Sequence, residues 1–116
     1  MQLPSRVQVT EVGPRDGLQS EPAFIPTERK VALIEALAAA GVPRIEATSF
    51  VHPRAVPQMA DAEAVLASIR RRPGTRYTAL VPNARGAERA LAARADELNV
   101  VVSSTEAMSQ ANVRMS

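Results

Sequence analysis

The feature of this sequence that most constrains its fold is a regular alternation of short, β-rich apolar runs with longer helical stretches. Strands are expected at residues 7–12, 44–48, 77–81 and 98–102. The stretches between them repeat apolar residues at helical spacing, and each unit spans about 30–35 residues. Strict alternation of this kind gives a parallel sheet with right-handed crossovers. The chain is therefore predicted to be an α/β protein.

Capping residues and helix breakers set the expected ends of the helices. Thr27, Asp61 and Asn83 are expected to cap the three helices, because their side-chain oxygens can accept from free backbone N–H groups. The first helix is expected to close at Gly41, the second to be broken by Pro73-Gly74, and the third to end near Ala93. The one basic cluster, at residues 70–72, lies where the second helix should end, and cations there complement the helix dipole.

Polar residues that follow the predicted strands decide between two folds that begin in this way. They are Arg15-Asp16, Thr48-Ser49, Asn83 and Ser103-Ser104. In a TIM barrel these ends converge on one mouth, whereas a doubly wound sheet concentrates function at one switch point. The sequence GPRDG after the first strand also lacks the glycine spacing of a dinucleotide-binding loop. We expect the N-terminal portion of a (β/α)8 TIM barrel, with about three and a half βα units.

The length of the chain limits how much of a barrel it can form. A complete barrel needs roughly 250 residues, and this sequence has 116. The outer strands of the partial sheet would be apolar and suited to burial, which makes exposed edges a liability. Residues 1–116 are therefore expected to be the incomplete N-terminal part of a single barrel domain, or a module that acquires partners to close its sheet.

Composition narrows the functional classes. The sequence has no cysteine, which excludes disulfides, thiolate metal sites and a cysteine nucleophile within it. A net charge of +2, dispersed arginines and only three aromatic residues argue against a nucleic-acid partner. No apolar run approaches the ~20 residues that span a bilayer, and the start resembles neither a signal nor a transit peptide. We expect a cytoplasmic protein without a membrane partner.

The segment EVGPRDGLQ at residues 11–19 carries most of the functional information. An ordinary turn would account for its proline, glycines and aspartate. A turn does not account for an Arg–Asp pair at the end of a first barrel strand. Asp16 is a hard oxygen donor suited to Mg²⁺ or Mn²⁺, and Arg15 can hold a carbonyl oxygen as it becomes negative. The residues alone leave both the turn and the metal-dependent site open.

Two further segments turn this motif into a family resemblance. With IEATSFVHPRAVPQMAD at residues 45–61 and LVPNARGAERAL at 80–91, the chain resembles the 3-hydroxy-3-methylglutaryl-CoA lyase family over nearly its whole length. The R-D-G motif is shared with related metal-dependent Claisen synthases, whereas SFVxPxxVPQMAD is more particular to the lyases. The resemblance implies a TIM-barrel enzyme of leucine and ketone-body catabolism. It would cleave 3-hydroxy-3-methylglutaryl-CoA to acetyl-CoA and acetoacetate with Mg²⁺ or Mn²⁺.

The resemblance also implies roles for five residues. Asp16 is implied to be a metal ligand, and Arg15 to stabilise the enolate oxygen of the departing acetyl-CoA. Glu46 is implied to lie near Arg15 and to orient it or contact the substrate. A carboxylate in a strand covered on both faces is costly unless paired, which favours an Arg15–Glu46 pair. Gln19 and Ser49 are implied to line the substrate pocket, and the other ligands and the general base to lie beyond residue 116.

Partners and alternatives complete the expectations. The resemblance implies an acyl-CoA substrate and a homodimer in the full-length enzyme. His52, the only histidine, is interpreted as a polar loop residue and not as a ligand. One alternative is a related enzyme, either a lyase for a longer-chain 3-hydroxy-3-alkylglutaryl-CoA or a Claisen synthase. The other is a non-catalytic truncated barrel, and a His-x-His motif in frame beyond residue 116 would argue against it.

Overall fold

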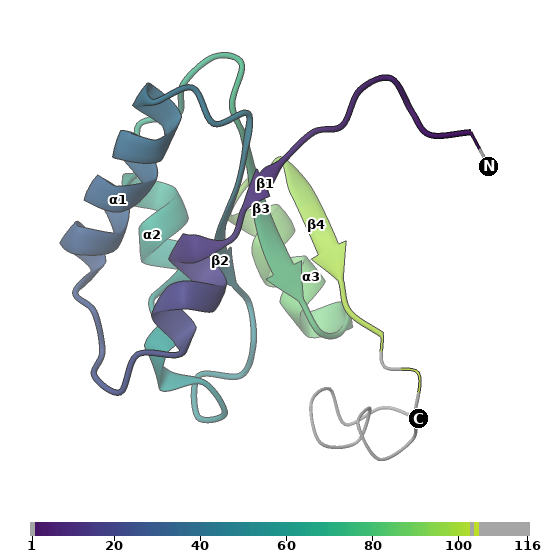
Figure 1. The fold of residues 1–116 in the computed structure, drawn as a ribbon. Helices are drawn as coiled ribbons and strands as arrows, with labels where there is room; N and C mark the ends of the chain where they lie inside the picture. Colours follow the sequence, from purple (N-terminus) through teal and green to yellow (C-terminus); the bar gives the residue numbers. More distant parts are fainter. Residues whose placement is uncertain (1, 103, 105–116) are drawn as a thin grey trace.

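The computed structural model describes residues 2–102 and 104, and it shows three helices packed on a parallel sheet (Figure 1). The strands are β1 Thr10–Glu11, β2 Arg44–Ser49, β3 Arg76–Val81 and β4 Glu97–Val100. The α-helices are α1 Thr27–Ala39, α2 Ala62–Ser68 and α3 Ala84–Ala92. Two short helical turns are η1 Gly13–Gly17, of π type, and η2 Pro57–Met59, of 3-10 type.

The strands follow one another in space as they do in sequence. The order is β1-β2-β3-β4, and every neighbouring pair is parallel. Right-handed crossovers that always move to the next strand in the same direction place their helices on one face of the sheet. A doubly wound sheet would reverse this direction at a switch point, and the described residues contain no such reversal. The predicted α/β fold is confirmed, with the strand order that opens a (β/α)8 barrel.

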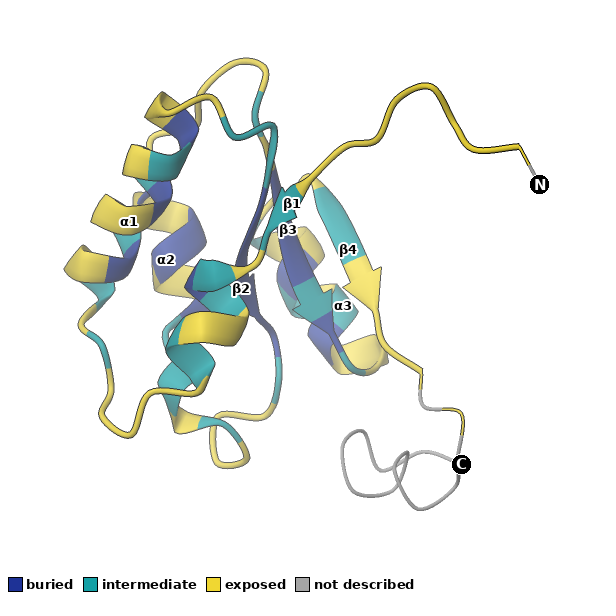
Figure 2. Cartoon of the chain, viewed as in Figure 1, coloured by how far each residue is buried: buried dark blue, intermediate teal, exposed yellow. Residues whose placement is uncertain are grey.

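The core lies between the sheet and the helices, where Figure 2 shows the buried residues in dark blue. In α1, Ile34 and Ala38 are one turn apart and at most 3% exposed, and the partly buried Val31 and Leu37 flank them. This is the apolar stripe expected from the sequence. The sheet and the other two helices complete the same cluster with Ile45, Ala47, Phe50, Ala62, Val65, Leu66, Ile69, Tyr77, Ala79, Val81 and Ala90.

Both edge strands differ from their predicted bounds. The first strand was expected over residues 7–12 but covers only Thr10–Glu11, and the residues before it are exposed. Thr10 pairs with Arg44, so an earlier start would place the strand opposite Pro43, which has no N–H to donate. At the other edge, β4 ends at Val100 because its partner β3 ends at the register-paired Val81. The prediction that Val101 and Val102 continue the strand is wrong.

Two of the three predicted caps work differently from the expectation. Asn83 does cap α3, since its Oδ1 accepts from the Gly86 N–H at 2.9 Å. Thr27 is the first residue of α1 rather than its cap, and its hydroxyl donates to Asp61 Oδ2 at 2.6 Å. Asp61 occupies the N-cap position of α2 but makes no side-chain cap hydrogen bond. Its carboxylate instead accepts hydrogen bonds from Thr27 and Lys30 of α1.

Of the arginines at 70–72, Arg71 contacts a different helix from the one predicted. Helix α2 ends at Ser68, and the guanidinium of Arg71 donates to the carbonyls of Ala93 and Arg94 just beyond α3. A cation at a helix C-terminus is favourable there too, so the physical reason holds although the helix is different. None of the helices in the described part of the chain is long and apolar enough to cross a membrane.

Candidate active site

The segment after β1 folds into a helical turn, Gly13–Gly17. The N–H groups of Arg15 and Asp16 donate to the Val12 carbonyl at 3.1 and 2.7 Å. The Leu18 N–H closes the π turn onto the carbonyl of Gly13. π turns are rare and are frequently found at functional sites in proteins. This one fixes two charged residues in succession at the carboxyl end of β1.

Arg15 and Glu46 form a buried ion pair, as the sequence predicted. Arg15 Nε donates to Glu46 Oε1 at 2.5 Å, and the side chains are 18% and 2% exposed. Glu46 lies in β2 between the buried Ile45 and Ala47. A carboxylate this far from water needs a compensating charge or hydrogen bonds. The pair supplies that compensation through Nε of Arg15. Because Nη1 donates to Asp16, Nη2 is the guanidinium nitrogen left to meet a ligand.

Asn99 of β4 is a member of this cluster that the sequence analysis missed. Its Nδ2 donates to Glu46 Oε2 at 2.5 Å, so both oxygens of the carboxylate have a donor. The available signal was an amide side chain in the otherwise apolar run of the fourth strand. The contact spans 53 residues of sequence and crosses β3. The contact becomes apparent only from the order of the parallel strands, which places β4 two strands from β2.

Asp16 lies at the outer end of the cluster, where it meets solvent. Its side chain is 63% exposed, and Oδ1 accepts from Arg15 Nη1 at 3.3 Å. A carboxylate with a free oxygen fits a hard divalent cation. Within residues 2–102 and 104, however, no group of three acidic or histidine side chains could enclose a metal. Both oxygens of Glu46 are already engaged, so Asp16 fits as one ligand of a set that these residues do not complete.

Gln19 and Ser49 are not drawn into the Arg15–Glu46 cluster by any hydrogen bond of the described residues. Gln19 Oε1 is buried and has no partner among these residues. An unsatisfied buried acceptor is unfavourable, so a hydrogen bond from a ligand N–H or O–H to Gln19 Oε1 would be stabilising. Ser49 is fully buried at the end of β2, and its hydroxyl donates to the Leu80 carbonyl at 3.4 Å.

The segment after Ser49 is held against α3. A Cβ on Gly86 would come within 2.6 Å of the Phe50 carbonyl oxygen, so only glycine allows this close approach. One turn later Arg89 donates to the Val51 carbonyl at 3.1 Å. His52 closes a local turn in which Nδ1 accepts from the Arg54 N–H at 3.1 Å. This contact agrees with the interpretation of His52 as a loop residue.

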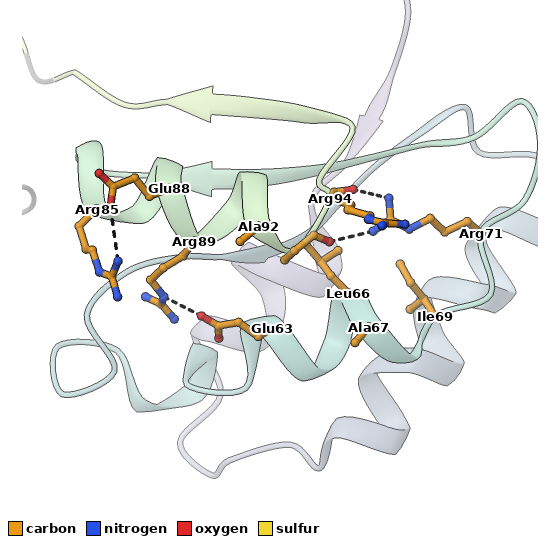
Figure 3. A pocket seen from close by; sticks show the side chains of 11 residues that line it. Glu63, Leu66, Ala67, Ile69, Arg71, Arg85, Glu88, Arg89, Ala92 and Arg94 are labelled. Carbon is orange, nitrogen blue, oxygen red and sulfur yellow. Dashed lines mark hydrogen bonds and ion pairs between the residues drawn. The ribbon is translucent and has the colours of Figure 1, made fainter.

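A separate groove runs between α2 and α3 (Figure 3). Its volume is about 770 Å³, and it is lined by apolar residues such as Leu66 and Ala92 and by charged residues along its rim. Two ion pairs on that rim, Arg89–Glu63 at 2.6 Å and Arg85–Glu88 at 3.4 Å, are visible in the figure. None of the site residues predicted from the sequence lines this groove.

Comparison with known proteins identifies the family to which this arrangement belongs. The HMGL-like family model matches residues 6–116. The mitochondrial hydroxymethylglutaryl-CoA lyase of Rattus norvegicus is 50% identical over 114 residues, which are 98% of this chain and 35% of the rat protein. A Pseudomonas aeruginosa protein named 3-hydroxy-3-isohexenylglutaryl-CoA/hydroxymethylglutaryl-CoA lyase is 48% identical over 116 residues, which are 100% of this chain and 39% of that protein.

A solved structure agrees with the sequence matches. The HMG-CoA lyase of Acinetobacter baumannii, in complex with coenzyme A and 3-methylmalate, superposes with a TM-score of 0.90 at 48% identity. The match covers 93% of this chain and 35% of that chain. The sheet thus corresponds to the N-terminal part of the lyase barrel, and the chain spans little more than a third of its relatives' length. A family match over residues 6–116, around the Arg15–Glu46–Asn99 cluster, shows that the chain belongs to the HMGL-like family.

Proposed function

We propose that these residues supply one side of the active site of a metal-dependent carbon–carbon lyase. The reaction is the cleavage of 3-hydroxy-3-methylglutaryl-CoA to acetyl-CoA and acetoacetate. One observation carries the proposal: in a chain about half identical to proteins named for this activity, a buried carboxylate fixes an arginine beside an exposed aspartate. Residues 1–116 would form the first part of one barrel domain, whose other strands complete the mouth.

Arg15 is the residue that meets the developing charge in this mechanism. When the carbon–carbon bond breaks, the electrons move onto the thioester carbonyl of the acetyl-CoA fragment. Glu46 holds Nε of Arg15 and Asp16 accepts from Nη1, so Nη2 of Arg15 remains to donate to that oxygen. Donors fixed before the reaction stabilise a transition state without the cost of reorganisation. Asn99 in turn holds the second oxygen of Glu46, which keeps the carboxylate from rotating away.

Asp16 provides a ligand for the divalent cation, Mg²⁺ or Mn²⁺. The cation would favour transfer of the proton from the tertiary hydroxyl of the substrate to a general base in the rest of the enzyme, as metals do for bound water. The enolate left when the carbon–carbon bond breaks then takes up a proton to give acetyl-CoA. Asp16 is positioned for this role by the π turn, which points it toward solvent next to Arg15. Gln19, whose buried oxygen lacks a partner among the described residues, is proposed to accept from the substrate. Ser49 is proposed to shape the pocket wall beneath it.

The substrate is proposed to be an acyl-CoA. The Acinetobacter baumannii lyase structure holds coenzyme A, which supports this class of ligand. A longer alkyl chain on the glutaryl unit is the second candidate, because the Pseudomonas aeruginosa relative is named for both substrates. The full enzyme is further proposed to be a cytoplasmic homodimer. A Claisen synthase and a non-catalytic module are the outcomes against which the experiment decides.

The test is a chimera in which residues 1–100 replace the matching segment of the Pseudomonas aeruginosa lyase. That protein supplies the remaining strands, and the two sequences are 48% identical over the 116 residues that match. The purified chimera is expected to release acetoacetate from 3-hydroxy-3-methylglutaryl-CoA when Mn²⁺ is present. Arg15→Ala in the chimera is the matched inactive control. A folded chimera that releases no acetoacetate, or that only condenses acyl-CoA substrates, would overturn the proposal.

A further inference from the structure

The proposed mechanism leaves one buried charged cluster unused, and this cluster surrounds Lys30. Lys30 is the only lysine in the sequence, lies in the first turns of α1, and is 2% exposed. Its ammonium donates to the Gln58 carbonyl at 2.5 Å and to Asp61 Oδ1 at 2.6 Å. It also lies 4.4 Å from the centre of the Phe24 ring. All its partners lie in the segments that follow β1 and β2.

Asp61 is committed to this cluster rather than to its own helix. Oδ1 accepts from Lys30, and Oδ2 accepts from the Thr27 hydroxyl at 2.6 Å. The side chain is 12% exposed and forgoes the cap hydrogen bond that its N-cap position in α2 would allow. Each ion taken out of water carries a desolvation cost of several kcal/mol. Stability alone does not explain the pair, because packed apolar residues of similar volume often stabilise equally well.

Gln58 extends the cluster to the segment that returns from the π turn. The side-chain Nε2 of Gln58 donates to the backbone carbonyl of Glu21 at 2.9 Å. The backbone carbonyl of Gln58 accepts from the ammonium of Lys30. Residues 18–26 are thereby tied to residues 52–61. Figure 1 shows α1 beside α2, with these two segments at one end of the helix pair. The VPQMAD motif at 56–61 thus has a structural task that no catalytic role explains.

We propose that Lys30 and Asp61 are positioning residues that clamp the segment after β1 to the segment after β2. The clamp keeps residues 18–26 in place and so holds the π turn, with Arg15 and Asp16, over the end of the sheet. The effect on catalysis rests on the proposed lyase function. The clamp itself does not, because it is defined by contacts within this chain. The experiment has one arm for each part.

The first arm uses the single lysine as a reporter in the 116-residue chain. An amine-acetylating reagent is applied, and Lys30 modification is followed by peptide mass spectrometry. Lys30 is expected to react at least about tenfold more slowly than in the urea-unfolded chain. Asp61→Asn is expected to raise that rate at least tenfold and to speed amide exchange in residues 18–26, with β2 and β3 unchanged. Glu28→Gln, at an exposed position of α1, is the matched control and should change neither.

Two results in this arm would overturn the clamp. One is a Lys30 that reacts in the native chain as fast as in the unfolded chain. The other is an Asp61→Asn chain whose Lys30 reactivity and amide exchange match those of the parent. If Asp61→Asn unfolds the chain, Thr27→Val removes one bond of the cluster and leaves the ion pair. It should then raise Lys30 reactivity by a smaller factor, and no change would count against the clamp.

The second arm measures catalysis in the chimeric lyase. Lys30→Met together with Asp61→Leu replaces the pair by apolar residues and is expected to restore most of the melting temperature lost in Lys30→Met alone. The double variant should still show a kcat at least about tenfold below the parent, with a smaller change in KM. Recovery of both the melting temperature and kcat would show that the pair has only a structural role and would contradict the positioning role. If the parent chimera is inactive, the lyase proposal fails, while the labelling arm still decides the clamp.

Discussion

Arg15 Nε lies 2.5 Å from Glu46 Oε1, which joins the turn after β1 to the interior of the neighbouring strand. The side chain of Glu46 is 2% exposed and that of Arg15 is 18% exposed, so each charge needs the other as a partner. Removing one partner of such a pair leaves the other charge uncompensated. The position of the arginine and the stability of β2 are therefore coupled. Variants of these two residues should affect both properties, in different proportions.

Arg15→Lys is expected to lower kcat of the chimeric lyase by about 10²–10³ with a much smaller change in KM. Lysine keeps the positive charge but cannot bond Glu46 and the substrate oxygen at once, because it lacks the planar fork of arginine. Steady-state kinetics with 3-hydroxy-3-methylglutaryl-CoA measures this. Arg54→Lys, in the exposed loop after β2, is the control. A raised KM with kcat intact would mean that Arg15 anchors the substrate and nothing more.

Glu46→Gln is expected to destabilise the chain by about 3–5 kcal/mol, because it removes the buried counter-charge of Arg15 and leaves only the exposed Asp16. It should also lower kcat in the chimera, since the guanidinium is no longer held. Urea unfolding followed by circular dichroism gives the free energy of unfolding. Glu28→Gln, at an exposed position, should change it by less than about 0.5 kcal/mol. Equal stability of Glu46→Gln and the parent would contradict the buried-pair description.

Asn99→Asp tests the contact that the sequence analysis missed. The change places a second carboxylate where Asn99 Nδ2 lies 2.5 Å from Glu46 Oε2, so a donor becomes a repelling charge. We expect a lower melting temperature at pH 7 that partly recovers as the pH falls and one carboxylate takes up a proton. Asn83→Asp, which retains the acceptor that caps α3, is the control. A pH-independent melting difference would show that the two side chains do not meet in solution.

The 116-residue chain alone is expected to bind Mn²⁺ weakly and to release no acetoacetate. Asp16 is the only predicted ligand that it supplies, and useful affinity for such cations needs more than one carboxylate. An open mouth also lets water screen every charge interaction within it. Calorimetric titration with Mn²⁺ and an acetoacetate assay against a metal-only blank check this. Tight one-to-one binding of Mn²⁺ would contradict the prediction, because it would require metal ligands in this chain besides Asp16.

The contact between Glu63 and Arg89 gives a pH prediction. The hydrogen bond from Arg89 lowers the pKa of Glu63 below its usual 4.5. A depressed folded-state pKa stabilises the fold above the usual value, and this contribution is lost as the pH falls through the depressed value. The effect should be small, because the Glu63 side chain is half exposed. Glu63→Gln should lower the melting temperature at pH 7, and the deficit should shrink below pH 4.5.

Thermal melts of the parent and of Glu63→Gln across the pH range measure that deficit. Glu88→Gln serves as the control, because its partner Arg85 is exposed and the pair lies at 3.4 Å on the surface. A Glu63→Gln deficit that stays constant from pH 7 to pH 3 would show that the contact with Arg89 does not persist in solution.

The alternation of apolar runs was sufficient to predict the parallel sheet and the three helices, because hydrophobic periodicity directly reflects which face is buried. A carboxylate between Ile45 and Ala47 in a covered strand was expected to need a counter-charge, and the family resemblance pointed to Arg15 as that partner. The Asn83 cap followed from a local rule. Each of these predictions depends on neighbours within a few residues, or on a desolvation cost that any buried charge incurs.

Tertiary structure decided the rest, because the deciding partners come from other elements of the fold. Register with Pro43 and Val81 sets where the edge strands begin and end, and no local signal in those strands carries this. Asp61 is a residue type that commonly caps helices, yet its two carboxylate oxygens accept hydrogen bonds from Lys30 and Thr27 of α1. Asn99 joins the site only because β4 lies two strands from β2. A side chain with several possible partners takes the one that packing brings within hydrogen-bond distance, and that distance is not written in the local sequence.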